Sequence, residues 1–178
     1  MIRRSNPGEP AGFNVALRFG GAIEPLHVSA IVVATPTEQT ARLLTSIETR
    51  FSETLGRIEY APVAEIGLGY HRKDILEPTF HGRGGFGFLI PRSEGLRSLG
   101  TVWTSTLFPG RAPEAAASFT TFMGGATDTA IRGCTDEEIA TTAHAELSRV
   151  LGIGRAPIAQ HIARWDRALP QYNVGHGT

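Results

Sequence analysis

The chain has 178 residues, of which 41% are hydrophobic, and its 17 Lys and Arg residues balance its 17 Asp and Glu residues. A length near ~150 residues is typical of one soluble globular domain with a substantial core. The balanced charge excludes a strong electrostatic field for nucleic acid or anionic lipid, and the single cysteine excludes both an internal disulfide framework and a cysteine-only metal site.

The N-terminal part of the chain predicts a flexible tail followed by a hairpin. Residues 1–12 are rich in Pro and Gly and are expected to be loose. Gly20-Gly21 follows the partly alternating run Phe13–Phe19, and paired glycines accept the positive φ that tight hairpins need. Residues 26–34 end in a β-branched apolar run, which is typical of a strand buried on both faces.

One helix is predicted from Pro36 to Leu55. Thr35 can cap it, Pro36 suits the first helical position, and Glu38 completes a capping box. Apolar residues recur at helical spacing up to Leu55, and Gly56 ends the pattern.

The rest of the chain predicts mostly strands, which lie over residues 61–70, 86–90, 99–105, 118–123 and 157–165. A second capped helix starts at Thr135, which has Glu138 three residues further on, and Gly152 ends it. Residues 170–178 show no regular pattern. We therefore predict a mixed α/β (α+β) fold in which strands outnumber helices.

A glycine-rich segment fits the letters of a dinucleotide-binding fingerprint. Residues 82–87 read Gly-Arg-Gly-Gly-Phe-Gly, the pattern G-x-G-x-x-G. That motif works between a strand and a helix whose N-terminus holds the pyrophosphate. Here an extended stretch ending at Pro91 follows, so we interpret the segment as a turn that permits close backbone approach.

Metal and nucleophile chemistry is not supported by the sequence. The histidines are scattered without carboxylates or thiolates at ligand spacing, so we expect no metal site. Cys134 lies in a loop without a positioned base, and no serine stands in a G-x-S-x-G elbow. We assign no catalytic residue. Residues 84–97, with nearby aromatic side chains, form either core or the wall of an apolar pocket for a flat ligand.

Several segments together resemble the protoporphyrinogen oxidase family, flavoproteins of the amine oxidase superfamily. The most specific are Gly-Phe-Gly-Phe-Leu-Ile-Pro-Arg at residues 85–92 and Phe-Pro-Gly-Arg-Ala-Pro at residues 108–113. Met-Gly-Gly at residues 123–125 and Pro-Gln-Tyr at residues 170–172 agree as well, whereas Val-Val-Ala-Thr-Pro at residues 32–36 recurs in many flavin oxidases. Order and spacing match from about residue 13 to residue 177.

This resemblance implies oxidation of a porphyrinogen to a porphyrin in haem biosynthesis, with FAD accepting hydride and O2 reoxidising the flavin. The cofactor would carry the chemistry, while the protein orients the macrocycle. Positions that match the family's substrate pocket are Phe86, Gly87, Leu89, Val102, Phe122 and Met123. Positions that match its flavin neighbourhood are Trp165 and Tyr172.

The same resemblance implies a division of the chain. Residues 13–60 would be the end of a Rossmann-like FAD-domain sheet with its helix, residues 61–165 part of an antiparallel or mixed-sheet substrate-binding domain, and residues 166–178 a return toward the FAD domain. Family members are longer and begin with a G-x-G-x-x-G turn that this sequence does not show before residue 13. We therefore expect an incomplete chain without measurable FAD affinity.

Three functions stay open at this point. The first is a protoporphyrinogen or coproporphyrinogen oxidase, and the second is another flavin-containing amine oxidase. The third is a non-catalytic remnant that binds porphyrin or docks with a separate FAD-domain chain. We expect no nucleic-acid partner, and we leave a homo-oligomer open. Without a signal segment after Arg3-Arg4, we expect a cytoplasmic protein, with peripheral membrane contact as a further alternative.

Overall fold

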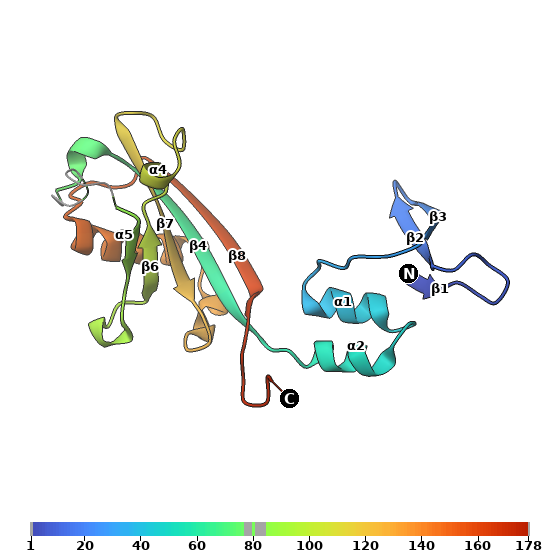
Figure 1. Ribbon diagram of the computed structural model, residues 1–178. Helices are drawn as coiled ribbons and strands as arrows, with labels where there is room; N and C mark the ends of the chain where they lie inside the picture. The colour runs from blue at the N-terminus through green and yellow to red at the C-terminus, as the bar shows by residue number, and fades with distance from the viewer. Residues whose placement is uncertain (1, 77–79, 81–84, 178) are drawn as a thin grey trace. The chain divides into compact units, whose positions relative to one another are not determined.

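The computed structural model describes residues 2–76, 80 and 85–177. The chain divides into two compact units, Met1–Glu59 and Tyr60–Thr178, whose elements are labelled in Figure 1. Each unit has its own antiparallel sheet and its own helices, so the predicted mixed α/β class is confirmed. Among the described residues, no helix is both long and apolar enough to cross a membrane.

The first unit contains a three-stranded antiparallel sheet in the order β1-β2-β3. Its strands are β1 (Ile2–Arg4), β2 (Phe13–Phe19) and β3 (Ala22–Val28). The predicted hairpin is confirmed, because Gly20 and Gly21 join β2 to β3 with φ values of 56° and 88°, as a two-residue hairpin loop with positive φ requires. Within the segment expected to be loose, Ile2 is buried and pairs with Val15.

The strand predicted over residues 26–34 is wrong beyond Val28. β3 pairs with β2, and β2 begins at Phe13, which lies opposite Val28. The apolar residues that follow have no strand beside them in the described part of the chain, and Val32 is 93% exposed. A β-branched run forms a strand only where a neighbouring strand can accept its hydrogen bonds.

The single helix predicted from Pro36 to Leu55 is two helices, α1 (Thr37–Leu44) and α2 (Thr49–Gly56). Hydroxyl groups around the break compete for helical carbonyls, since those of Thr45 and Ser52 both donate to the Ala41 carbonyl, at 2.9 and 2.7 Å. The predicted capping box is absent as well. Pro36 stands at the N-cap without a side-chain bond, and the Thr35 hydroxyl pairs with that of Thr40.

The second unit is a five-stranded antiparallel sheet in the order β5-β6-β7-β4-β8. The strands are β4 (Tyr60–His71), β5 (Gly87–Leu89), β6 (Ser98–Val102), β7 (Ala116–Gly124) and β8 (Ala159–Pro170). The connections hold α4 (Thr104–Leu107) and three short 3-10 turns, η1 (Arg72–Asp74), η2 (Arg92–Glu94) and η3 (Thr129–Gly133). The strand predictions here are confirmed with shifted ends, except that residues 103–105 leave the sheet. The indole of Trp103 turns into the core, where it meets the ring of Phe80 at 5.3 Å.

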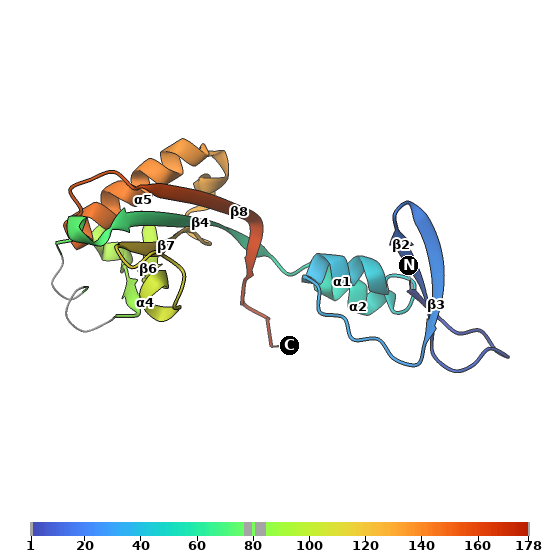
Figure 2. The ribbon, with the colours of Figure 1, turned by 90° about the horizontal axis from the view of Figure 1, so that it is seen from above.

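Helix α5 (Asp136–Leu151) covers one face of this sheet, as Figure 2 shows. Its predicted capping box is confirmed. The Thr135 hydroxyl accepts from the Glu138 amide at 3.2 Å, while the Glu138 carboxylate accepts from the Thr135 amide at 2.8 Å. Gly152 ends the helix with φ 64°, also as predicted. The apolar residues of α5 and of the covered sheet face form the hydrophobic core of the unit.

Candidate functional site

The two faces of the second sheet have different surroundings. Along β4, Ala64 and Ile66 are buried in the core beneath α5, so strand alternation places Val63 and Glu65 on the opposite face. That opposite face, here called the open face, holds a pocket of about 620 Å³. The pocket is lined by Val63, Phe86, Gly87, Phe88, Leu89, Leu99, Gly100, Thr101, Val102, Phe122, Trp165, Ala168 and Leu169.

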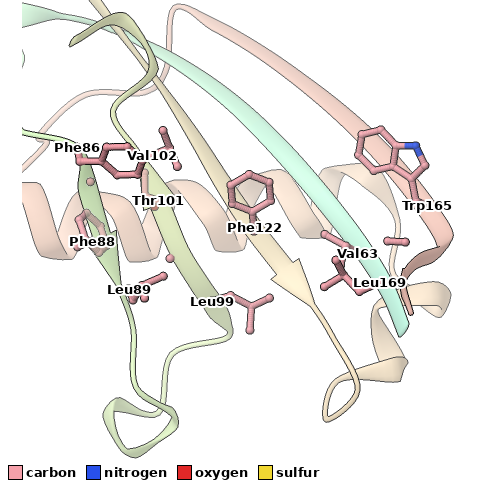
Figure 3. Close-up of a pocket in the computed structure, with 13 residues that line it drawn as sticks. Val63, Phe86, Phe88, Leu89, Leu99, Thr101, Val102, Phe122, Trp165 and Leu169 are labelled. Atoms are coloured by element: carbon pink, nitrogen blue, oxygen red, sulfur yellow. The ribbon is translucent and has the colours of Figure 1, made fainter. Parts of the chain in front are cut away.

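The side chains around the pocket come from all five strands and are almost entirely apolar. Figure 3 shows Phe122 of β7 between the residues of β5 and β6 and those of β4 and β8. Large apolar groups stand at its rim, and Phe86 and Leu89 are 72% and 87% exposed. Contiguous exposed apolar surface of this kind is typical of a binding site.

Glycines allow the two strands at one side of the pocket to approach closely. Gly87 has φ 140°, and a Cβ on it would stand 2.0 Å from the Thr101 carbonyl oxygen. A Cβ on Gly100 would stand 2.6 Å from the Phe88 carbonyl oxygen. Any side chain at either position would therefore push β5 away from β6. The predicted close backbone approach is found at Gly87, although Gly87 opens a strand and does not lie in a turn, whereas residues 82–84 lie outside the described residues.

Hydrogen bonds from α5 hold the start of β6. One carboxylate oxygen of Glu146 accepts from the Arg97 amide at 2.7 Å. The other oxygen accepts from the Ser98 amide at 2.9 Å and from the Ser98 hydroxyl at 2.5 Å. The pairing of β6 with β7 shifts register between Ser98 and Gly100. This irregularity lets Ser98 face α5 while Leu99 and Gly100 line the pocket.

An ion pair between Arg97 and Asp128 also supports the start of β6. The Arg97 guanidinium donates to both carboxylate oxygens of Asp128, at 2.7 and 3.1 Å. These hydrogen bonds hold the pKa of the Asp128 carboxyl below its ordinary value and raise the pKa of Arg97. The guanidinium also donates to the Cys134 sulfur at 3.1 Å. The Arg97–Asp128 ion pair therefore supports the start of β6 from the face of the sheet that α5 covers.

The structure brings most of the predicted site residues together in this pocket, namely Phe86, Gly87, Leu89, Val102, Phe122 and Trp165. It does not bring Met123 there, because Met123 follows Phe122 on β7 and points into the core, where it is fully buried. Tyr172 lies beyond β8, where it is 79% exposed and its ring meets that of His176 at 4.4 Å.

Sequence reasoning missed other residues that line the pocket, chiefly Val63 of β4, Leu99 of β6 and Leu169 of β8. Their contribution depends on which strands are neighbours. Val63 pairs with Trp165 across β4 and β8, more than 100 positions away in the chain. Alternation along β4 could have identified Val63 as sharing a face with Glu65, but the pairing with β8 is not visible in the sequence.

The described residues fit a flat apolar ligand better than they fit a dinucleotide. Trp165 is 46% exposed at the pocket and could contact a flavin ring. Gly87 opens a strand, however, and in the part of the chain that the structure describes we find no glycine-rich turn leading from a strand into a helix N-terminus, as pyrophosphate binding requires. Nor do three or more His, Cys, Asp or Glu side chains gather as metal ligands within residues 2–76, 80 and 85–177.

Known proteins have sequences similar to that of this chain. The chain is 31% identical over 179 residues to protoporphyrinogen oxidase 1 of Spinacia oleracea, which covers 98% of this chain and 31% of that protein. It is 26% identical over 152 residues to coproporphyrinogen III oxidase of Bacillus subtilis, which covers 85% of this chain and 31% of that protein. The chain thus spans about a third of the length of these curated relatives.

Solved structures share the fold. A proposed protoporphyrinogen oxidase from Exiguobacterium sp. 255-15 superposes with a TM-score of 0.69 at 18% identity, covering 98% of this chain and 35% of that one. Reduced UDP-galactopyranose mutase gives 0.66 at 11% identity, covering 90% of this chain and 33% of that one. The family model described as flavin containing amine oxidoreductase matches residues 2–178. The chain therefore belongs to the flavin-containing amine oxidoreductase family.

Proposed function

We propose that the open face binds a porphyrinogen and that the chain takes part in the FAD-dependent oxidation of that porphyrinogen to a porphyrin, with O2 as acceptor. The observation that carries this proposal is the apolar pocket on the sheet, whose walls suit a macrocycle with an apolar ring. The names of the relatives, protoporphyrinogen oxidase and coproporphyrinogen III oxidase, support the substrate class.

In this proposal the residues of the sheet bind, orient and shield the macrocycle. Phe122 forms the middle of the pocket, and Leu89 and Val102 flank it from β5 and β6. Burying such side chains against a ligand contributes about 25 cal/mol for each Å² of apolar surface removed from water. Flavin would supply the redox chemistry when bound, but the described residues do not fit its pyrophosphate.

Titration with protoporphyrin IX and with coproporphyrin III, followed by absorbance, tests the binding part of the proposal. We expect a saturable shift of the main absorption band with the wild-type chain. Phe122→Asp should weaken binding at least tenfold, because a carboxylate in the pocket must be desolvated next to the ring. Phe51→Asp, at a half-exposed position on α2, is the matched control and should bind like the wild type. No shift with either porphyrin, together with no binding of coproporphyrinogen III under anaerobic conditions, would refute the proposal.

A porphyrin-binding protein without catalysis is the second candidate. It is favoured by the lack, among the described residues, of a turn that could hold the FAD pyrophosphate. We expect no measurable FAD affinity for this chain in a flavin-fluorescence titration, and purified protein that is yellow would contradict that expectation. The rate at which coproporphyrinogen III becomes the fluorescent porphyrin in air, with FAD added, separates the two candidates. A rate above that of spontaneous oxidation would favour the oxidase over the binding protein.

A further inference from the structure

One carboxylate lies on the apolar open face. Glu65 is in the middle of β4 and pairs in register with Phe122 of β7 and with Ala163 of β8. Side chains opposite one another in an antiparallel pair have Cβ atoms about 5 Å apart, so the side chains of Glu65 and Phe122 start next to each other on the open face, with Glu65 just outside the residues that line the pocket. Gly67, the next residue of β4 on this face, has no side chain to cover it.

This carboxylate has no partner among the described residues. No hydrogen bond or ion pair within that part of the chain involves it, although its side chain is partly buried. By contrast, the carboxylates of Glu146 and Asp128 in the same unit are hydrogen-bonded. A ligand that covers the open face would desolvate Glu65, and a desolvated carboxylate is costly unless donors replace the lost water.

We propose that Glu65 accepts hydrogen bonds from the pyrrole N–H groups of a reduced, non-planar tetrapyrrole bound over Phe122. This inference rests on the proposed function. A porphyrinogen carries four pyrrole N–H groups, and because its ring is not planar, several of them can point toward one side of the macrocycle. A carboxylate accepts at two oxygens and bonds most strongly to donors of this kind when water is excluded.

The same geometry discriminates between the reduced and the oxidised ring. A porphyrin is planar, and only two of its four nitrogens carry hydrogen, both directed into the ring. The other two nitrogens present lone pairs, which repel a carboxylate. Glu65 therefore makes the site bind the porphyrinogen in preference to the porphyrin, and it acts as a specificity-determining residue rather than a catalytic one.

Calorimetric titration under anaerobic conditions, with coproporphyrinogen III and coproporphyrin III as probes, tests this inference. We expect Glu65→Gln to weaken porphyrinogen binding about tenfold, which corresponds to about 1.4 kcal/mol, and not to weaken porphyrin binding. Both probes carry the same carboxylate side chains. Any effect of the lost Glu65 charge on those carboxylates is therefore the same for both probes and cancels in the ratio of their affinities. Glu53→Gln, the same change at an exposed position on α2, should leave the ratio unaltered.

Thermal unfolding separates recognition from a structural role. Glu65→Leu removes an unpartnered carboxylate from an apolar surface, so it should lose the porphyrinogen preference without lowering the melting temperature. If wild type binds both probes and Glu65→Gln leaves the ratio of affinities unchanged, the inference about Glu65 is overturned and the proposed function stands. If wild type binds neither probe, the proposed function itself fails.

Discussion

Replacing Glu146 tests how α5 supports the pocket from behind. Glu146→Ala removes the acceptor of three hydrogen bonds, from the amides of Arg97 and Ser98 and from the Ser98 hydroxyl. Ser98 is 2% exposed, so water cannot easily replace the lost acceptor. The perturbation is thus mainly the creation of unsatisfied donors at the start of β6.

The expected loss of unfolding free energy follows from the number of buried donors that are left without an acceptor. An unsatisfied buried donor costs about 1–3 kcal/mol. The Ser98 hydroxyl can rotate to another acceptor, so two backbone amides remain and Glu146→Ala should destabilise the second unit by about 2–6 kcal/mol. Glu146→Gln keeps one oxygen for Ser98 but turns an NH2 group toward the Arg97 amide. It should cost about half as much, roughly 1–3 kcal/mol.

Tryptophan fluorescence during urea unfolding measures this effect directly. Both tryptophans of the chain, Trp103 and Trp165, belong to the second unit, so the signal reports the unit that Glu146 supports. Glu137→Gln is the matched control on the same helix, where the carboxylate is exposed and its loss should cost under about 1 kcal/mol. An unfolding free energy of Glu146→Ala within about 0.5 kcal/mol of the wild type would refute the reasoning.

Two further predictions concern the ion pair and the glycine beside the pocket. Arg97 holds the pKa of Asp128 below its ordinary value, so the stabilisation is present above about pH 4, the ordinary pKa of Asp, and is lost as pH falls through the lower folded-state pKa. The difference in urea midpoint between wild type and Asp128→Asn should therefore shrink below pH 4, and a constant difference from pH 7 to pH 2 would contradict this. Gly87→Ala should separate β5 from β6, since its Cβ would stand 2.0 Å from the Thr101 carbonyl oxygen. We expect faster hydrogen exchange of β5 amides and weaker porphyrin binding with α5 still protected, and unchanged exchange in β5 would count against it.

Local patterns predicted the elements whose determinants lie close together in the chain. The prediction of the second capped helix, α5, is confirmed at both ends, because Thr135, Glu138 and Gly152 act within the helix and its immediate flanks. The hairpin at Gly20-Gly21 is correct for the same reason. Residue identity within a few positions is sufficient for caps and two-residue turns, since their hydrogen bonds are local.

Local patterns failed where a distant contact decides between two conformations. Apolar spacing favours one helix from Pro36 to Leu55, yet the chain bends after Leu44, where the Ser46 hydroxyl donates to the Ile2 carbonyl at 2.5 Å. The apolar run after Val28 likewise depends on whether β2 extends far enough to pair with it.

The sequence by itself determined the fold class, the family resemblance and six of the thirteen residues that line the pocket. Only the tertiary structure decided which of two neighbours, Phe122 or Met123, faces that pocket, because strand alternation exposes one of them once α5 has covered the other face. It alone also placed Glu65 beside Phe122 and Val63 beside Trp165. Strand order across a sheet is set by packing between distant segments, and no local pattern carries that information.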